Sequence, residues 1–270
     1  MPPQYEVRAK DRIKRGLQEY STILAKAAER GINEEDTSVI VQAMLVDLLG
    51  YDRFWEISGQ FQVKGHWADW AVKLDDKVMY FVEVKQLGTK LRDKDLFQVI
   101  NYSVPQGLSW AVLTTGDVWQ CHRVAGGKDI QEFFEVRVLD PNQSVREKVD
   151  YLYLLSREGM KRSALEAHWS HAECYRPEKL AALVVSEQVL TVLRRLVKRE
   201  KPGRRVQVTE LREALLRGVI RGDLQASVHA AAGSPARKRA SGGKKRRAEL
   251  TPSPDVETGA LSGSQEPPPT

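Results

Sequence analysis

Glu83 and Lys85 lie two residues apart in a segment whose other side chains are mostly apolar. The segment is VMYFVEVKQL, residues 78–87, and its composition is typical of a β-strand inside a sheet. Because side chains alternate along a strand, both charges point to one face, while Val82 and Val84 point to the other. Burying an ion costs several kcal/mol unless it finds a partner. We therefore interpret the two charges as groups that do chemistry, with a salt bridge on an exposed strand face as the alternative.

Asp69 supplies a second carboxylate, 14 residues before Glu83. It lies between two tryptophans in GHWADWAV, at a predicted turn or strand start, and a hairpin would bring it beside Glu83 at one edge of the sheet. Two adjacent carboxylates repel each other unless a cation lies between them. Oxygen ligands suit Mg²⁺ or Mn²⁺, and Lys85 on the same face could orient or deprotonate an attacking water. The three residues predict metal-dependent hydrolysis of a phosphodiester; the alternative for Asp69 is an ordinary turn acid.

The first 140 residues show alternating helical and strand patterns. Helical spacing, with Gly31 and Asn33 as caps, predicts helices at residues 4–30 and 34–49. Strands are predicted at residues 54–63, 67–74, 78–86, 109–114, 117–124 and 132–139, with one helix at 93–104 between the third and the fourth. This order predicts a mixed sheet with helices packed on its faces, an α/β or α+β core at residues 1–140.

Beyond residue 140 the sequence becomes basic and helical. Residues 1–140 contain 18 Lys/Arg and 21 Asp/Glu, whereas residues 141–222 contain 17 and 10. Helices are predicted at residues 144–157, 161–174, 178–199 and 208–221, which form a basic helical extension at residues 141–225. Its segment RRLVKREKPGRR, residues 194–205, could bind phosphates, with a solvated helix end as the alternative. Residues 226–270 are rich in Gly, Ser, Pro and Ala and are predicted to be a disordered tail.

Asp69 followed by Glu83-Val84-Lys85 resembles the signature of the PD-(D/E)xK nuclease superfamily, although Ala68 stands where that superfamily has a proline. Five phrases strengthen the resemblance by their order: NEEDT, LLGYD, GHWADWAV, FVEVKQLG and GLSWAVLTTGDVWQCHRV. Together they resemble the N-terminal nuclease domain of type I restriction enzyme R subunits, in its stand-alone form. The resemblance implies a restriction-endonuclease-like core that cleaves DNA with Mg²⁺ or Mn²⁺ and takes part in restriction of foreign DNA.

The resemblance also assigns roles to the residues of the signature. Asp69 and Glu83 would be metal ligands, and Val84 would contribute to the same metal site. Lys85 would position the attacking water and act as its base. These assignments agree with the chemistry that the residue types themselves suggest.

Two further pairs of residues match the family pattern outside the signature. Glu34 would be the acidic residue on the helix that precedes the sheet, with Glu35 as a close rival. Gln98 and Tyr102 match a Q-x-x-x-Y pattern, share one helix face, and would contact DNA or steady the active site. The alternatives are first-turn acids that favour the helix dipole, a surface glutamine and a tyrosine at the edge of the core.

Composition and missing motifs narrow the remaining possibilities. No segment of about 18 apolar residues is present, and two cysteines in unrelated contexts fit a reducing compartment, so a cytoplasmic protein without a membrane partner is expected. Without a G-x-x-x-x-G-K-[ST] motif, a partner protein would have to supply any helicase. The predicted function is a metal-dependent DNA endonuclease that makes mainly backbone contacts. The alternative is a catalytically silent nucleic-acid-binding or partner-recruiting module with the same fold, and action on RNA is a further option.

Overall fold

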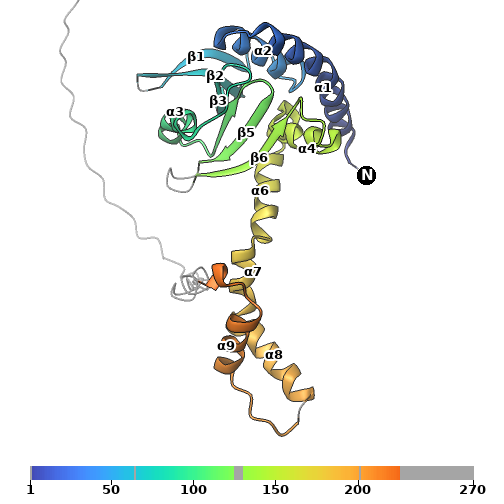
Figure 1. The fold of residues 1–270 in the computed structure, drawn as a ribbon, viewed down its shortest axis with the longest axis vertical. Coiled ribbons are helices and arrows are strands. Elements are labelled where there is room, and N and C mark those ends of the chain that lie inside the picture. The colour runs from blue at the N-terminus through green and yellow to red at the C-terminus, as the bar shows by residue number, and fades with distance from the viewer. Residues whose placement is uncertain (1, 64, 125–129, 201, 226–270) are drawn as a thin grey trace, which may run out of the picture.

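Six β-strands form one sheet between two layers of helices in the computed structural model, and a helical arm extends from it (Figure 1). The structure describes residues 2–63, 65–124, 130–200 and 202–225, so the predicted tail lies outside the described residues. The strands are β1 (Ile57–Val63), β2 (His66–Leu74), β3 (Lys77–Val84), β4 (Trp110–Thr114), β5 (Val118–Arg123) and β6 (Gln131–Arg137). They lie in the sheet in chain order. β3 and β4 are parallel, and the other neighbouring pairs are antiparallel.

The helices fall into a group around the sheet and a group in the arm. Around the sheet lie α1 (Gln4–Arg30), α2 (Glu34–Asp47), α3 (Asp93–Ser103), α4 (Val145–Leu155) and α5 (Arg157–Lys161), with a short 3₁₀ helix, η1 (Val104–Gln106). The arm contains α6 (Ala164–Cys174), α7 (Pro177–Val184), α8 (Glu187–Glu200) and α9 (Val208–Gly218). The predicted fold class, a mixed sheet flanked by helices and followed by further helices, is confirmed. Among the described residues, none of the helices is both long and apolar enough to span a lipid bilayer.

The predicted strand at residues 54–63 begins only at Ile57, because the residues before it form a turn. Asp52 Oδ1 accepts hydrogen bonds from the N–H groups of Phe54 and Trp55 at 2.8 and 2.9 Å. The Glu56 N–H then donates to the Asp52 carbonyl at 3.1 Å. An aspartate that satisfies nearby N–H groups in this way favours a turn over a strand.

The predicted helix at residues 178–199 is in fact two helices, α7 and α8, with Val185 and Ser186 between them. Ser186 precedes α8 in the manner of an N-cap. Its carbonyl accepts the Leu190 N–H at 2.9 Å and its hydroxyl accepts the Val189 N–H at 3.5 Å. Serine is among the residues most favoured at this position, which explains why a new helix starts there.

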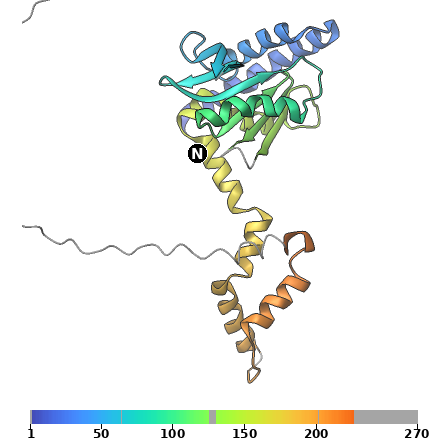
Figure 2. The ribbon, with the colours of Figure 1, turned by 90° about the vertical axis from the view of Figure 1, so that its left-hand side faces the viewer.

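The two faces of the sheet pack against different helices. Tyr80, Val82 and Val84 of β3 belong to the large core that includes residues of α1, α2 and α4. Phe81 points the other way, into a smaller core with Val99 of α3. α1 and α3 therefore lie on opposite sides of the sheet (Figures 1 and 2). By the same alternation, Glu83, two positions after Phe81, faces the α3 side of the sheet.

Two buried tyrosines connect the sheet to the end of α4. Tyr51 Oη and Tyr80 Oη both donate to the Leu155 carbonyl, at 2.7 and 3.0 Å. Both side chains are almost completely buried. A carbonyl at a helix end has no partner within its own helix, so these hydroxyls supply one from the core.

We expect Tyr80→Phe to lower the free energy of unfolding by about 1 kcal/mol, because a buried hydrogen bond is lost while the ring remains. Tyr51 still satisfies the Leu155 carbonyl in that variant. The double variant with Tyr51→Phe should therefore lose more than the sum of the two single changes. Urea denaturation of the four proteins checks this, and strict additivity would contradict it.

Candidate active site at the end of β3

Asp69 lies inside β2, and its carboxylate bonds to the backbone of β3. Asp69 was predicted at a turn or strand start, and it is the fourth residue of β2, which extends from His66 to Leu74, so it does not lie in a turn. The β2–β3 ladder ends at the pair Trp70–Val82. Beyond that pair, the Val84 N–H donates to Asp69 Oδ2 at 2.8 Å. A side-chain carboxylate thus takes the place of the carbonyl that a continued antiparallel ladder would offer.

The neighbouring strand is irregular at the same level. Gln60, which would face Asp69 across the β1–β2 ladder, is not paired with it, although the pairs on either side keep their register. Gln60 has a φ of 46°, an uncommon value for a residue with a Cβ. Ala68 and Ala71 pack in the same α3-side core, whereas strict alternation would put them on opposite faces. The strand therefore twists at Asp69, which brings its carboxylate to β3.

Lys85 lies between two glutamates that come from different elements. Its Nζ is 2.6 Å from Glu83 Oε1 and 3.7 Å from Glu34 Oε1. The exposed fraction of the side chain is 1% for Glu83, 15% for Lys85 and 53% for Glu34. Glu34 stands in the first turn of α2. Of the two predicted candidates it is the one beside Lys85, since Glu35 forms no ion pair within the described part of the chain.

The charges around Lys85 influence one another. Burial raises the pKa of Asp69 above its ordinary value and the charge of Glu34 adds to this, while the Val84 N–H and Lys85 act in the opposite direction. For Lys85, burial lowers the pKa, but the hydrogen bond and charge of Glu83, with Glu34 and Asp69, raise it further, so the net pKa is raised. Lys85 is therefore an ammonium ion at neutral pH and holds Glu83 as its counter-ion.

The N-terminus of α2 is bonded to the loop that follows β3. The Leu87 N–H donates to Thr37 Oγ1 at 3.1 Å, and the Thr37 hydroxyl donates to the Asn33 carbonyl at 2.7 Å. Gln86 Nε2 donates to the Ile32 carbonyl at 2.9 Å. Thr37 is fully buried. These bonds fix the first turn of α2 against the end of β3, and so keep Glu34 within reach of Lys85.

Sequence reasoning missed the residues that make this connection. Thr37 belonged to the NEEDT phrase, and a threonine in the first turn of a helix was the available signal. A further bond from Trp70 Nε1 to Ser38 Oγ, 2.9 Å long, joins α2 to β2. Nothing in the sequence indicated that Ser38 or Gln86 would contact another element.

The other predicted site residues lie apart from these charges or contribute differently. Val84 is fully buried in the large core, so it contributes its backbone to the site. Gln98 is exposed on α3 and makes no hydrogen bond to Asp69, Glu83 or Lys85 within the described residues. The side chain of Tyr102 lies outside the described part of the structure. The Gln98–Tyr102 role stays a prediction.

The donor set can be compared with what a divalent cation needs. Among the described residues, no three or more His, Cys, Asp or Glu side chains form a group that could hold a metal. A Mg²⁺ site, however, commonly uses one or two carboxylates and completes its shell with water and phosphate oxygens. Asp69 Oδ1 accepts no hydrogen bond from a described residue. Lys85 forms ion pairs with Glu83 and Glu34, and the charge of Asp69 also acts on it. Asp69 and Glu83 are therefore the two carboxylates here that could serve as donors to a hard cation.

We expect Asp69→Asn to raise the stability of the metal-free protein at neutral pH. The folded-state pKa of Asp69 is raised, so the folded state binds a proton more tightly than the unfolded state does. Ionisation of Asp69 therefore lowers stability as pH rises from about 3.9, the unfolded pKa, through the raised folded pKa. The stability gap between the variant and the wild type should open over this interval and then stay constant.

Urea denaturation at several pH values, with chelator present, checks this expectation. Asp11→Asn on the exposed side of α1 is the matched control and should show no such pH-dependent gain. A wild type that is more stable than Asp69→Asn at neutral pH would contradict the assignment.

No family model matches the sequence, and neither a curated protein nor a solved structure matches it significantly. Support for a function comes from the geometry of Glu34, Asp69, Glu83 and Lys85 and from the chemistry of these groups.

Proposed function

We propose that the chain is a metal-dependent nuclease that hydrolyses phosphodiester bonds in DNA. The observation that supports this most is the meeting of Asp69, Glu83, Lys85 and Glu34 at the end of β3. The spacing of these four residues in the sequence does not by itself explain why they lie close together. The order of the phrases around them, which resembles R-subunit nuclease domains, favours DNA as the polymer.

Each side chain has a definite part in this proposal. The carboxylates of Asp69 and Glu83 are the oxygen donors for Mg²⁺ or Mn²⁺, which when bound supplies Lewis-acid stabilisation of charge on the phosphate. The Lys85 ammonium group donates a hydrogen bond to the attacking water and so orients it. Glu34 is exposed and near Lys85, where it provides a second counter-ion.

Glu34 matters because the Glu83 carboxylate cannot fully bind both the Lys85 ammonium group and a metal ion. In the structure Glu83 Oε1 is engaged by Lys85 at 2.6 Å. A Glu83 carboxylate that held a divalent cation would be less available to Lys85, and the interactions that raise the pKa of Lys85 would weaken. Because burial by itself lowers the pKa of Lys85, a weaker pairing with Glu83 would lower that pKa from its raised value. Glu34 keeps the ammonium group in place during this exchange.

A second candidate is a nucleic-acid-binding module without catalysis. The short Lys85–Glu83 ion pair favours the non-catalytic module. If that pair never separates, only the Asp69 carboxylate remains to bind a metal ion. The two candidates differ in whether phosphodiester bonds are cut.

Purified protein should cleave plasmid or single-stranded DNA with Mg²⁺ or Mn²⁺ and not with chelator. Glu83→Gln and Lys85→Ala should each lower the rate roughly 100-fold or more, because each removes a group that stabilises charge in the transition state. Glu35→Gln is the matched control, one residue from Glu34 but unpaired with Lys85, and should keep near wild-type activity.

Cleavage that survives in Glu83→Gln would show a contaminant or another site. DNA binding by all four proteins, without cleavage under either metal, would favour the non-catalytic module instead.

Metal binding should also stabilise the fold without any substrate. At a Mn²⁺ concentration about 100 times Kd, the wild type should gain about 2.7 kcal/mol in free energy of unfolding. Asp69→Asn should gain much less, because it keeps the shape of the side chain but loses the anionic donor. Thermal melts with and without Mn²⁺ measure the difference, and an equal shift in both proteins would place the metal elsewhere.

A further inference from the structure

The arm is attached to the sheet through a polar and aromatic contact at the base of α6. Glu166 Oε1 accepts hydrogen bonds from Trp110 Nε1 at 2.7 Å and from Arg123 at 2.8 Å. Trp169, one turn along α6, packs edge-on against Trp110 with ring centroids 5.8 Å apart. From this base, α6 leads away from the sheet toward α7, α8 and α9 (Figures 1 and 2).

Positive charge is concentrated in this arm. Residues 1–175 contain 23 Lys/Arg and 26 Asp/Glu, whereas residues 176–225 contain 12 and 6. The part of the chain with the candidate active site therefore has a net charge of −3. Residues 176–225, which contain α7, α8 and α9, have a net charge of +6.

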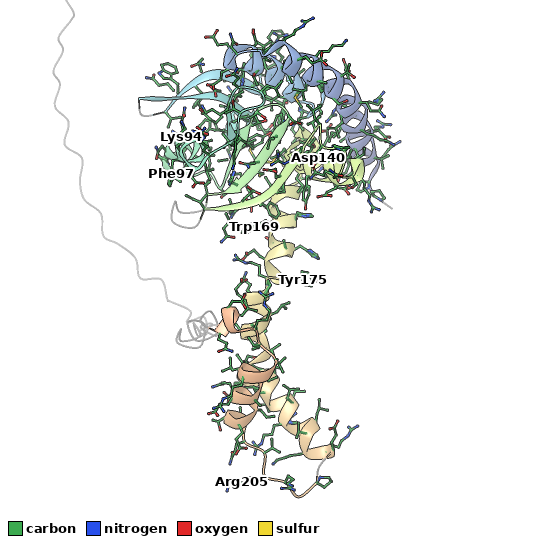
Figure 3. The ribbon with its side chains drawn as sticks, viewed as in Figure 1. Lys94, Phe97, Asp140, Trp169, Tyr175 and Arg205 are labelled. Carbon is green, nitrogen blue, oxygen red and sulfur yellow. The ribbon has the colours of Figure 1, made fainter. Side chains whose placement is uncertain are left out.

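Ion pairs within the arm leave one group of cations without partners. The arm cations that form ion pairs are Arg176, Lys179, Arg212, Arg217 and Arg221. The exposed cations that form no ion pair with any described residue are Arg195, Lys198, Arg199, Arg204 and Arg205. We call these five the basic tip. They lie on the second half of α8 and the loop after it, and Figure 3 shows Arg205 at the end of the arm farthest from the sheet.

The helix dipole explains only part of this arrangement. Cations in the last turn of a helix are favourable, which accounts for Lys198 and Arg199. Arg204 and Arg205 lie beyond α8, where that effect has faded. Glu200 is the one acid among the described residues from 194 to 206.

We infer that the basic tip binds the phosphate backbone of the same DNA on which the core acts. Identifying the polyanion as DNA rests on the proposed function. The acidic site repels a polyanion, so affinity has to come from another part of the chain, and the basic tip is the largest set of unpaired cations in the arm. Arginine presents a planar fork of donors that matches phosphate oxygens, and four of the five tip cations are arginines.

An anionic membrane is the competing partner, because Val192 and Leu196 on α8 are also exposed. A basic amphipathic helix of that kind suits a lipid surface. The loop that carries Arg204 and Arg205, however, has no exposed large apolar side chain among its described residues. A surface with cations and no apolar anchor suits phosphate contacts along a polymer.

The lengths of the arm helices guide the choice of DNA lengths for a test. α6 has 11 residues and α8 has 14, and at 1.5 Å per residue their rises total about 37 Å. That is the length of about 11 base pairs of B-DNA. A duplex of about 40 base pairs is longer than these two helices together, and one of about 8 base pairs is shorter.

The test measures binding separately from cleavage. The tip variant is Arg199→Glu with Arg204→Glu and Arg205→Glu. The control variant makes the same change of charge on exposed cations of α1, Arg8→Glu with Lys14→Glu and Lys26→Glu. Fluorescence anisotropy with chelator present follows binding to a labelled duplex of about 40 base pairs and to one of about 8. Circular dichroism melts check that each variant is folded.

For the long duplex, the tip variant should bind roughly tenfold more weakly or worse at low salt. The slope of log Kd against log salt should fall by about 2 to 3, close to one unit per lost phosphate contact. The control should change affinity less than about threefold on either duplex. On the short duplex, which the tip can bind by itself, the tip variant should again bind more weakly than the other two proteins.

Equal losses in the tip and control variants would overturn the inference, since net charge alone would explain them. Binding of the wild type to anionic lipid vesicles, with no salt-dependent binding to DNA, would overturn it in favour of a membrane. Cleavage assays keep the two proposals apart. Tip-dependent binding without cleavage would refute the nuclease, whereas cleavage of the long duplex that the tip variant leaves unchanged would refute only the role of the tip.

Discussion

The hydrogen bond from the Val84 N–H to the Asp69 carboxylate is the contact on which the candidate site depends. A side chain occupies a position that a strand backbone would otherwise fill, so β2 and β3 separate after the Trp70–Val82 pair. The separation leaves an anion in a half-buried place beside Glu83, where burial raises its pKa. Because the Val84 N–H must have a partner, the structure keeps Asp69 there despite that cost. A side-chain amide could make the same bond without the charge, so the bond alone does not explain why the residue is an acid.

The charge at this position becomes intelligible together with its neighbours. Glu83 is buried and paired with Lys85, and Glu34 approaches the same ammonium group from α2. The approach depends on the buried hydroxyl of Thr37, which accepts the Leu87 N–H and connects α2 to the loop after β3. Three anions around one cation leave an imbalance that water screens only in part. A bound divalent cation would offset this excess of negative charge. The same carboxylates would therefore lower the stability of the free protein and support its proposed activity.

Much of this could be predicted from the sequence, because alternation and helical spacing are local properties. The strand with Glu83 and the helix that begins after Asn33 lie where their patterns placed them. The strand that contains Asp69 was predicted, but its bond to the Val84 N–H was not, because that bond forms where the strand ladders are irregular, beside Gln60 in a left-handed conformation that no residue pattern signals. The choice between Glu34 and Glu35 was equally open, because it is settled by the rotation of α2 against the sheet. That rotation is fixed by contacts between residues far apart in the chain, such as Trp70 with Ser38.

Under the proposed function, the separation of negative and positive charge along the chain follows from the same constraint. Cations placed beside Asp69 and Glu83 would form ion pairs with them, as Lys85 already does, and would compete with a metal for the same oxygens. Affinity for a polyanion can therefore be increased without occupying the site only if further cations lie beyond the reach of those carboxylates. α6 provides that distance, because Glu166 fixes its base to the sheet and its axis leads outward (Figure 2). An exposed cation at the end of the arm also keeps its hydration until a phosphate replaces the water, so it lowers the stability of the free protein little. Its contribution to the affinity for phosphate depends strongly on salt.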